Sequence, residues 1–378
     1  MRTLQLGEGW FPEHASGLNQ VFYNLMAHLP GAGVEARGLV AGPPDLAART
    51  GGQVAAFAAP DAPLATRWRH ARRAVRGVLA EDAPALVAAH FALYAAPVVR
   101  RLGETPLVVH FHGPWADESR VEGAGRLAAA LKHRLERSVY RRAARCIVLS
   151  SAFRDVLHQR YNVPEERIHV VPGGVDAARF AVEATPRAAR ARLGWDPDRP
   201  TVLAVRRLRR RMGLEDLIEA MAAVRQAVPE ALLLVAGRGP LAPDLQSRID
   251  AAGLGAHVRL LGFVPDADLP LAYRAADLTV VPTVALEGFG LITLESLAAG
   301  TPVLVTPVGG LPEAVRGLAP AMVLPASGPA ALADGIAAAL RGTLRLPGAD
   351  ACRRYAAEQF GWPVIARRIR AVYAEACR

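Results

Sequence analysis

A turn that contains two glycines and a glutamate is the segment best suited to hold a charged ligand. Glu287 lies in this turn, after the apolar run 278–281, and Glu295 lies in the helical pattern that begins near Gly290. Glycines at 288 and 290 let the backbone approach a phosphate closely, and the first N–H groups of the helix point at an anion. The two carboxylates are eight positions apart, so we expect them to hold different parts of one ligand rather than to form an acid–base pair.

Arginines dominate the loop that follows another apolar run, residues 201–205. Five of the six residues from 206 to 211 are arginine. A guanidinium fork at the end of a strand can grip a diphosphate through two hydrogen bonds. A solvated basic loop is the alternative, and we expect it at least for Arg209.

Histidines follow two apolar runs in the first half of the chain. His110 and His112 alternate along the run that begins at Leu107, so they lie on one face, with His112 nearer the carboxyl end. His90 follows another run. A hydrogen-bonded structural histidine is the alternative to a role in binding.

The elements that must position these residues are two sets of short apolar runs separated by helical patterns. This alternation is typical of parallel sheets covered by helices, an α/β fold. The turn-rich segment 172–200 separates the two sets, which predicts an amino-terminal domain of residues 1–180 and a carboxy-terminal domain of residues 181–361. Rossmann-like, doubly wound domains that face each other bind ligand in the cleft outside the carboxyl ends of their strands.

Several segments of the chain, taken in order, resemble one enzyme family. The stretch from Glu287 to Glu295, with its Gly-Phe-Gly-Leu turn and the trailing Ala-Ala-Gly-Thr-Pro-Val, is similar to the signature of the retaining GT-B glycosyltransferases of family 4. Shorter segments also fall in that family's order: residues 171–180, 235–240, 261–264, 273–277 and 308–313. The resemblance covers nearly the whole chain. It implies a GT-B fold, in which residues 362–378 pack back on the first domain.

The resemblance implies a function and roles for the glutamate turn. The family transfers a sugar from a nucleotide-diphosphate sugar to an acceptor hydroxyl. Its first glutamate lies against the donor sugar and its second binds the ribose, roles that fall to Glu287 and Glu295. A helix cap at Glu287 and a surface position for Glu295 are the alternative. The remaining expected donor-binding residues of this domain contribute backbone: Gly237, Gly288, Phe289, Gly290 and Leu291.

The basic loop departs from the family pattern. The family has glycine, arginine and leucine here, then three residues, then lysine and glycine. Arg207 matches the arginine, but Arg206 occupies the glycine position and Met212 the lysine position. Because a methionine cannot neutralise a phosphate, we expect Arg211 to replace the lysine; the alternatives are replacement by Arg210 or weakened donor binding.

The first domain supplies the other expected contacts. The segment from His14 to Asn19 resembles the family's glycine-rich first loop, in which Gly17 is the best match for the backbone that approaches the donor phosphates. The family often has a histidine that contacts the donor sugar, and His112 matches it. His90 is expected to line the acceptor pocket.

The reaction that the resemblance implies retains the anomeric configuration. Arg207, Arg211 and the helix amides would stabilise the charge that develops on the β-phosphate of the leaving nucleoside diphosphate. Retention is usually explained by front-face attack, so Glu287 is assigned to positioning, and Glu287, Arg207, Arg211 and His112 form the expected catalytic set. No cofactor or metal is expected. The sequence Asp-Ala-Asp at 266–268 is interpreted as a polar helix cap.

Composition limits the partners. The net charge is +10 over 378 residues, yet Lys132 is the single lysine, which indicates a general arginine bias and not a nucleic-acid partner. The basic segments 67–76 and 126–145 are expected to be solvated helix faces, with contact to an anionic membrane as the alternative. Three separated cysteines and an N-terminus without a long apolar segment predict a cytoplasmic protein, with a peripheral place on the inner membrane face as the alternative.

The acceptor is expected to be a glycan or glycolipid, by analogy with surface polysaccharide synthesis in the family. The residues leave the donor base, UDP or GDP, and the oligomeric state open. Two other functions stay open at this point. One is a GT-B sugar-nucleotide 2-epimerase, and the other is a catalytically silent GT-B binding protein, which Met212 makes conceivable.

Overall fold

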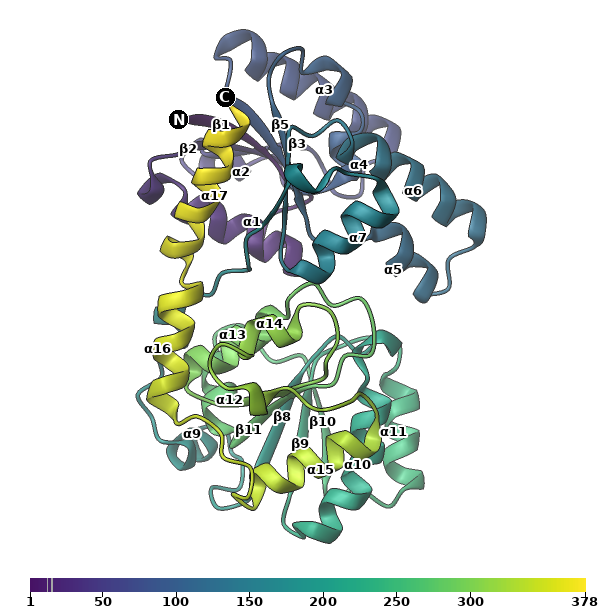
Figure 1. Cartoon of the computed structure of the whole chain (residues 1–378), viewed down its shortest axis with the longest axis vertical. Helices are drawn as coiled ribbons and strands as arrows, with labels where there is room; N and C mark the ends of the chain where they lie inside the picture. The colour runs from purple at the N-terminus through teal and green to yellow at the C-terminus, as the bar shows by residue number, and fades with distance from the viewer. Residues whose placement is uncertain (12, 15) are drawn as a thin grey trace. The chain divides into compact units, whose positions relative to one another are not determined.

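Each half of the chain contains its own parallel sheet, which is formed by short buried strands and accompanied by helices (Figure 1). The computed structural model describes residues 1–11, 13–14 and 16–378; Ala15, part of the expected first loop, lies outside them. The first unit comprises residues 1–173 and 362–378, and the second comprises residues 174–361. Residues 174–180, assigned from sequence to the first domain, belong to the second unit because Val175 pairs with Gly361 and the Phe180 ring packs against Tyr273.

The first sheet has seven parallel strands in the order β3-β2-β1-β4-β5-β6-β7. Its strands are largely buried, as is usual for a parallel sheet covered by helices on both faces. The order reverses between β1 and β4, so the loops that follow these two strands flank the topological switch point. The strands are β1 (Arg2–Leu6), β2 (Glu35–Ala41), β3 (Val54–Ala58), β4 (Leu86–Ala89), β5 (Leu107–Phe111), β6 (Arg145–Val148) and β7 (Ile168–Val170).

The helices of the first unit include one from the end of the chain. Helix α17 (Trp362–Ala376) packs against α1, β5 and β6, and the Trp362 ring stacks on His28. The other α-helices are α1 (Gly17–His28), α2 (Leu46–Arg49), α3 (Leu64–Glu81), α4 (Ala92–Ala95), α5 (Trp115–Val121), α6 (Arg126–Tyr140) and α7 (Ser151–Tyr161), and the 3₁₀ turns are η1 (Pro30–Ala32), η2 (Val99–Arg101) and η3 (Glu165–Arg167). Among the described residues, no helix is both long and apolar enough to cross a membrane.

The second sheet has five parallel strands in the order β10-β9-β8-β11-β12, with its switch point between β8 and β11. The strands are β8 (Thr201–Val205), β9 (Leu232–Ala236), β10 (Val258–Gly262), β11 (Leu278–Val281) and β12 (Val303–Val305). The α-helices are α8 (Ala177–Phe180), α9 (Pro186–Arg192), α10 (Leu214–Ala227), α11 (Ala242–Ala251), α12 (Leu269–Ala275), α13 (Leu291–Ala299), α14 (Leu311–Val315), α15 (Pro329–Leu340) and α16 (Ala349–Phe360), and the 3₁₀ turns are η4 (Arg210–Met212) and η5 (Pro320–Met322).

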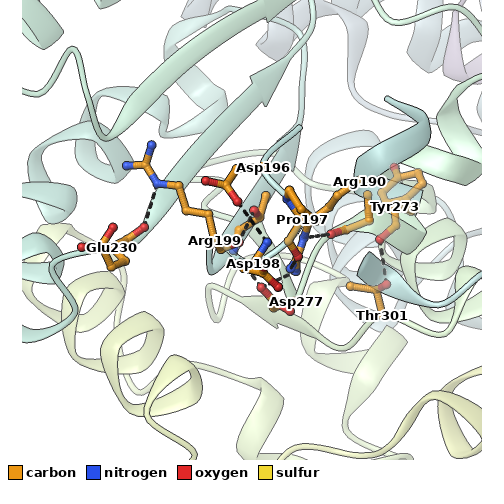
Figure 2. Close-up of polar contacts among 11 residues, drawn as sticks. Arg190, Asp196, Pro197, Asp198, Arg199, Glu230, Tyr273, Asp277 and Thr301 are labelled. Carbon is orange, nitrogen blue, oxygen red and sulfur yellow. Dashed lines mark hydrogen bonds and ion pairs between the residues drawn. The ribbon is translucent and has the colours of Figure 1, made fainter. Parts of the chain in front are cut away.

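The buried side chain of Arg190 links the amino ends of the neighbouring strands β8 and β11 (Figure 2). Arg190 donates from Nε to the carbonyl of Ala275 at 2.8 Å and from Nη1 to the carbonyl of Pro197 at 3.1 Å. It also pairs with Asp277, whose carboxylate accepts the backbone N–H of Thr201 at 2.8 Å. Since Thr201 begins β8 and Asp277 immediately precedes β11, the cluster fixes the edge opposite to the carboxyl ends.

Replacing this arginine should destabilise the second unit. Arg190→Met leaves Asp277 without its cation and two carbonyls without a donor, so we expect the free energy of unfolding to fall by roughly 2–3 kcal/mol. Hydrogen–deuterium exchange in β8 and β11 across a urea series measures it. Arg187→Met is the matched control because the ion pair of Arg187 with Asp198 is exposed, and the change should cost less than about 1 kcal/mol. Equal effects of the two changes would contradict this account.

Candidate functional site

The loops that follow β8, β9, β11 and β12 contact one another through their backbones at the carboxyl edge of the second sheet. The N–H of Arg206 donates to the carbonyl of Ala236 at 2.8 Å, and the N–H of Gly310 donates to the carbonyl of Glu287 at 3.1 Å. A Cβ at Gly237 would lie 1.8 Å from the Arg206 carbonyl oxygen, and one at Gly309 would lie 2.0 Å from that of Glu287. Only glycine permits such contact, so these glycines fix the spacing of the loops.

The loop after β11 is held in one conformation from both sides. Thr306 donates from Oγ1 to the carbonyl of Thr283 at 2.6 Å, and the N–H of Val284 donates to the carbonyl of Arg211 at 3.0 Å. Leu286 has a left-handed backbone, with φ of 54°, which is unfavourable for a side chain with a Cβ. Arg211 donates from Nη1 to the Leu286 carbonyl at 2.8 Å and so helps to hold this strained residue next to Glu287.

The Glu287 carboxylate is buried and ionised. Its Oε2 atom pairs with Nη2 of Arg206 and accepts a hydrogen bond from Oγ1 of Thr283 at 3.2 Å. Burial alone would raise the pKa of Glu287, but the Arg206 charge, with help from Arg211 and Thr283, lowers the pKa below its usual value. The lowered pKa favours the negatively charged form of the carboxylate at neutral pH.

Helix α13 begins directly after this turn, as the sequence predicts. Gly290 is its N-cap residue, and Leu291 is the first helical residue. Glu295 is 5% exposed and accepts a hydrogen bond from the Tyr273 hydroxyl at 2.9 Å. Burial, followed by the neighbouring charge of Glu295, raises the pKa of Tyr273, so the phenol stays a donor to the carboxylate. The alternative of a surface position for Glu295 is wrong.

The structure distributes the arginines of the basic loop differently from the sequence interpretation. Arg206, placed at a glycine position by the resemblance and given no role, is the arginine paired with Glu287. Arg207 is exposed, whereas Arg211 is buried and bonded to Leu286. Met212 is 3% exposed and belongs to the apolar core, so the expected lysine position is a core position here. The signal that could have identified Arg206 is its place as the first residue after β8.

In the first unit, the loop after β1 leads into α1. Ser16 caps that helix by accepting the N–H of Asn19 at 3.1 Å. Gly17 is the first helical residue, and a Cβ there would meet no atom of the described residues within 4 Å. Packing therefore does not require a glycine at 17, and the space beside its backbone is open.

The three histidines form one stacked network, in which His90 and His110 are buried and His112 is partly exposed. The rings of His90 and His110 stack at 4.2 Å, and Nδ1 of His90 lies 3.3 Å from Nε2 of His112. Nε2 of His90 lies 3.1 Å from Oε1 of Gln5, and Nε2 of His110 lies 2.8 Å from the Tyr373 hydroxyl. Burial lowers the pKa of all three, to about 4 for His112, so they are neutral at pH 7. His90, expected to line an acceptor pocket, is buried against His112.

The described part of the chain contains no cluster of side chains that could bind a metal ion. Among residues 1–11, 13–14 and 16–378, no group of three or more histidine, cysteine, aspartate or glutamate side chains could hold a metal ion. Asp268 is the N-cap residue of α12, and the Asp266 carbonyl accepts from Nη2 of Arg179 at 2.8 Å. The Asp268 side chain makes no capping hydrogen bond among the described residues, so the cap predicted from the sequence is one of position alone.

Two family models match the chain, one in each half. The model described as glycosyl transferases group 1 matches residues 187–359, and the model described as Glycosyltransferase Family 4 matches residues 15–179. Curated relatives include the D-inositol 3-phosphate glycosyltransferase of Salinispora arenicola, 37% identical over 257 residues that cover 64% of this chain and 57% of that protein. The mannosylfructose-phosphate synthase of Agrobacterium fabrum is 32% identical, covering 57% of this chain and 52% of that protein. The chain spans about half the length of the curated relatives that it matches.

Solved structures share the fold of the whole chain. HepE of Anabaena, in complex with UDP and glucose, superposes with a TM-score of 0.80 at 20% identity, covering 99% of this chain and 100% of that one. The sucrose-phosphate synthase of Thermosynechococcus elongatus gives 0.76 at 22% identity and covers 99% and 98% of the two chains. At these identities the likeness shows the fold, which is GT-B.

The histidine network should make the first unit sensitive to acid. An imidazole that stays neutral in the folded unit binds a proton only after unfolding, where its pKa is near 6.5. The free energy of unfolding of the first unit is therefore highest above pH 6.5 and falls as the pH is lowered. Each such histidine should lower it by about 2 kcal/mol at pH 5 relative to pH 7.5. Urea unfolding at the two pH values, compared between the wild type and His110→Gln, measures this difference. The variant should lose less stability than the wild type on acidification, and an identical loss would contradict the prediction.

Proposed function

The chain belongs to the family 4 glycosyltransferases with the GT-B fold, and we propose that it transfers a sugar from a nucleoside-diphosphate sugar to an acceptor hydroxyl with retention of configuration. The observation that carries the proposal is the ionised Glu287 at the switch point of the second sheet. It lies between an arginine-rich loop and the start of α13, where a sugar and a diphosphate can be bound side by side.

The roles that we assign come from the family resemblance. Glu287 accepts hydrogen bonds from hydroxyls of the donor sugar, and Glu295 receives the ribose. Arg207, exposed at the end of β8, and the amides from Gly288 to Leu291 stabilise the charge that develops on the leaving diphosphate. Gly237 lets the neighbouring loop approach the same ligand.

The reaction needs no enzymic nucleophile under this proposal. In front-face attack the departing phosphate oxygen takes the proton of the acceptor hydroxyl, so the buried carboxylate serves to orient the donor. Gly17 and the neutral His112 are assigned to the donor on the strength of the family resemblance. His112 acts as a hydrogen-bonding group, because its pKa of about 4 keeps it unprotonated at neutral pH.

The other two functions make different predictions. A 2-epimerase would change the sugar of the donor without an acceptor, and a silent binding protein would bind donor without turnover. Relatives of this chain are named as glycosyltransferases and synthases, which favours the transfer reaction.

A panel of UDP and GDP sugars tests the proposed activity. We expect at least one donor to raise the melting temperature and to release UDP or GDP on turnover. Glu287→Gln and Arg207→Gln should each lower kcat/KM by roughly 100-fold, because each removes a charge that the transition state uses. Arg248→Gln is the control, since Arg248 makes only an exposed pair within α11. If no sugar nucleotide binds or is turned over, the transferase assignment is wrong.

We further propose that helix α6 contacts an anionic membrane, where a glycolipid acceptor would reside. Leu127 and Leu131 are 89% and 69% exposed on this helix, an unusual exposure for leucine. Arg134, also exposed, lies at the next position of the same helix face. A face with apolar residues at one end and positive charge at the other is complementary to anionic lipid headgroups over acyl chains.

Vesicle binding tests this contact. The double variant Leu127→Ser, Leu131→Ser should reduce cosedimentation with phosphatidylglycerol vesicles at least fivefold, because it removes most of the apolar area that the bilayer would cover. Val170→Ser is the control, an exposed apolar residue on the edge strand β7. Equal vesicle binding by the double variant and the control would exclude α6 as the contact. Equal binding of the wild type to phosphatidylcholine and to phosphatidylglycerol vesicles would exclude a contribution from charge.

A further inference from the structure

Arg206 is buried at the site although the family pattern calls for glycine at its position. Its side chain is 7% exposed, and Nη2 contacts both Oε2 of Glu287 and Oγ1 of Thr283. Its backbone is fixed to β9 through the Ala236 carbonyl. The residue thus joins the end of the β8–β9 pair to the carboxylate on the loop after β11.

Stability does not explain this arrangement. Two charges taken out of water are costly even when they pair well. Nε of Arg206 is also buried without a hydrogen-bond partner among the described residues, and an unpaired buried N–H is unfavourable. A glycine at 206 would avoid both costs, so the arrangement indicates a role in the site.

The geometry of the pair leaves one side of the carboxylate available. Both of its side-chain contacts fall on Oε2. Within the described part of the chain, Oε1 of Glu287 has no hydrogen-bond partner. A carboxylate gripped by one oxygen has a fixed plane, and its second oxygen is oriented by the same contacts.

We infer that Arg206 is a positioning residue, which fixes the Glu287 carboxylate so that Oε1 faces the hydroxyls of the donor sugar. This inference rests on the proposed function, in which Glu287 contacts that sugar. Arg206 also places a positive charge beside the donor site in a chain whose expected lysine position is the core residue Met212. Arg211 reaches the same carboxylate by its charge but is bonded to the Leu286 carbonyl.

Arg206→Gln, Arg206→Lys and the control Arg248→Gln test the inference with the donor that the wild type turns over best. Arg248 has an exposed pair with Asp244 inside α11 and no assigned role in the site. We expect Arg206→Gln to lower kcat by roughly 10- to 100-fold, with Arg206→Lys intermediate. Because the arginine charge keeps the pKa of Glu287 low, its removal should also shift the acid limb of the kcat/KM profile to higher pH. A double-mutant cycle with Glu287→Gln should show that the two changes are not additive.

The outcomes separate this inference from the proposed function. If the wild type turns over a donor but Arg206→Gln behaves as Arg248→Gln does, the positioning role is wrong and the transferase assignment stands. Loss of activity with an unmoved acid limb would also overturn it, because a purely structural defect has that signature. Melting temperatures show whether Arg206→Gln fails to fold. In that case the test is the kcat/KM profile of Arg206→Lys, whose acid limb must lie within about half a pH unit of that of the wild type if the inference is right.

Discussion

The ionised carboxylate of Glu287 is the feature on which the rest of the second unit's site depends. Burial opposes its charge, but the Arg206 guanidinium, together with Arg211 and Thr283, lowers the pKa of Glu287 below its usual value. Such a balance requires the two groups to stay in contact, because a buried carboxylate without its cation takes up a proton instead. Several contacts keep the loops that carry these two groups together: the close backbone approaches at Gly237 and Gly309 and the hydrogen bond from Arg211 to Leu286. By fixing the shape of the loops, they also help to keep the Glu287 carboxylate ionised.

The fold supplies this arrangement through sheet topology. Parallel strands present all their carboxyl ends at one edge, and the loops on either side of the switch point diverge to opposite faces of the sheet. In the second unit these loops follow β8 and β11, and they carry Arg206 and Glu287. The Arg190 cluster pins the same two strands at their amino ends, so the strands that carry the site are fixed along their length.

Much of this arrangement could be predicted from the sequence, for definable reasons. The alternating apolar runs predicted two parallel α/β units, since burial on both faces leaves a clear pattern. The turn after β11 and the start of α13 were predicted because glycine and helix signals are local. The partners of individual arginines were not. Five neighbouring arginines look alike in sequence. The packing of η4 places Met212 in the core and Arg211 against Leu286, whereas the end of β8 places Arg206 beside Glu287.

The cation beside Glu287 is an arginine, and the chemistry of its guanidinium has consequences for the carboxylate. An ammonium group is a point charge on a flexible stem and can follow a phosphate as it moves. A guanidinium is planar, and here one nitrogen of Arg206 is shared between Thr283 and Glu287. It therefore stabilises the orientation of its neighbours at least as much as it attracts an anion. The chain has a single lysine, at position 132, and the cation beside Glu287 is the planar guanidinium of Arg206. Such a group can fix the orientation of the Glu287 carboxylate.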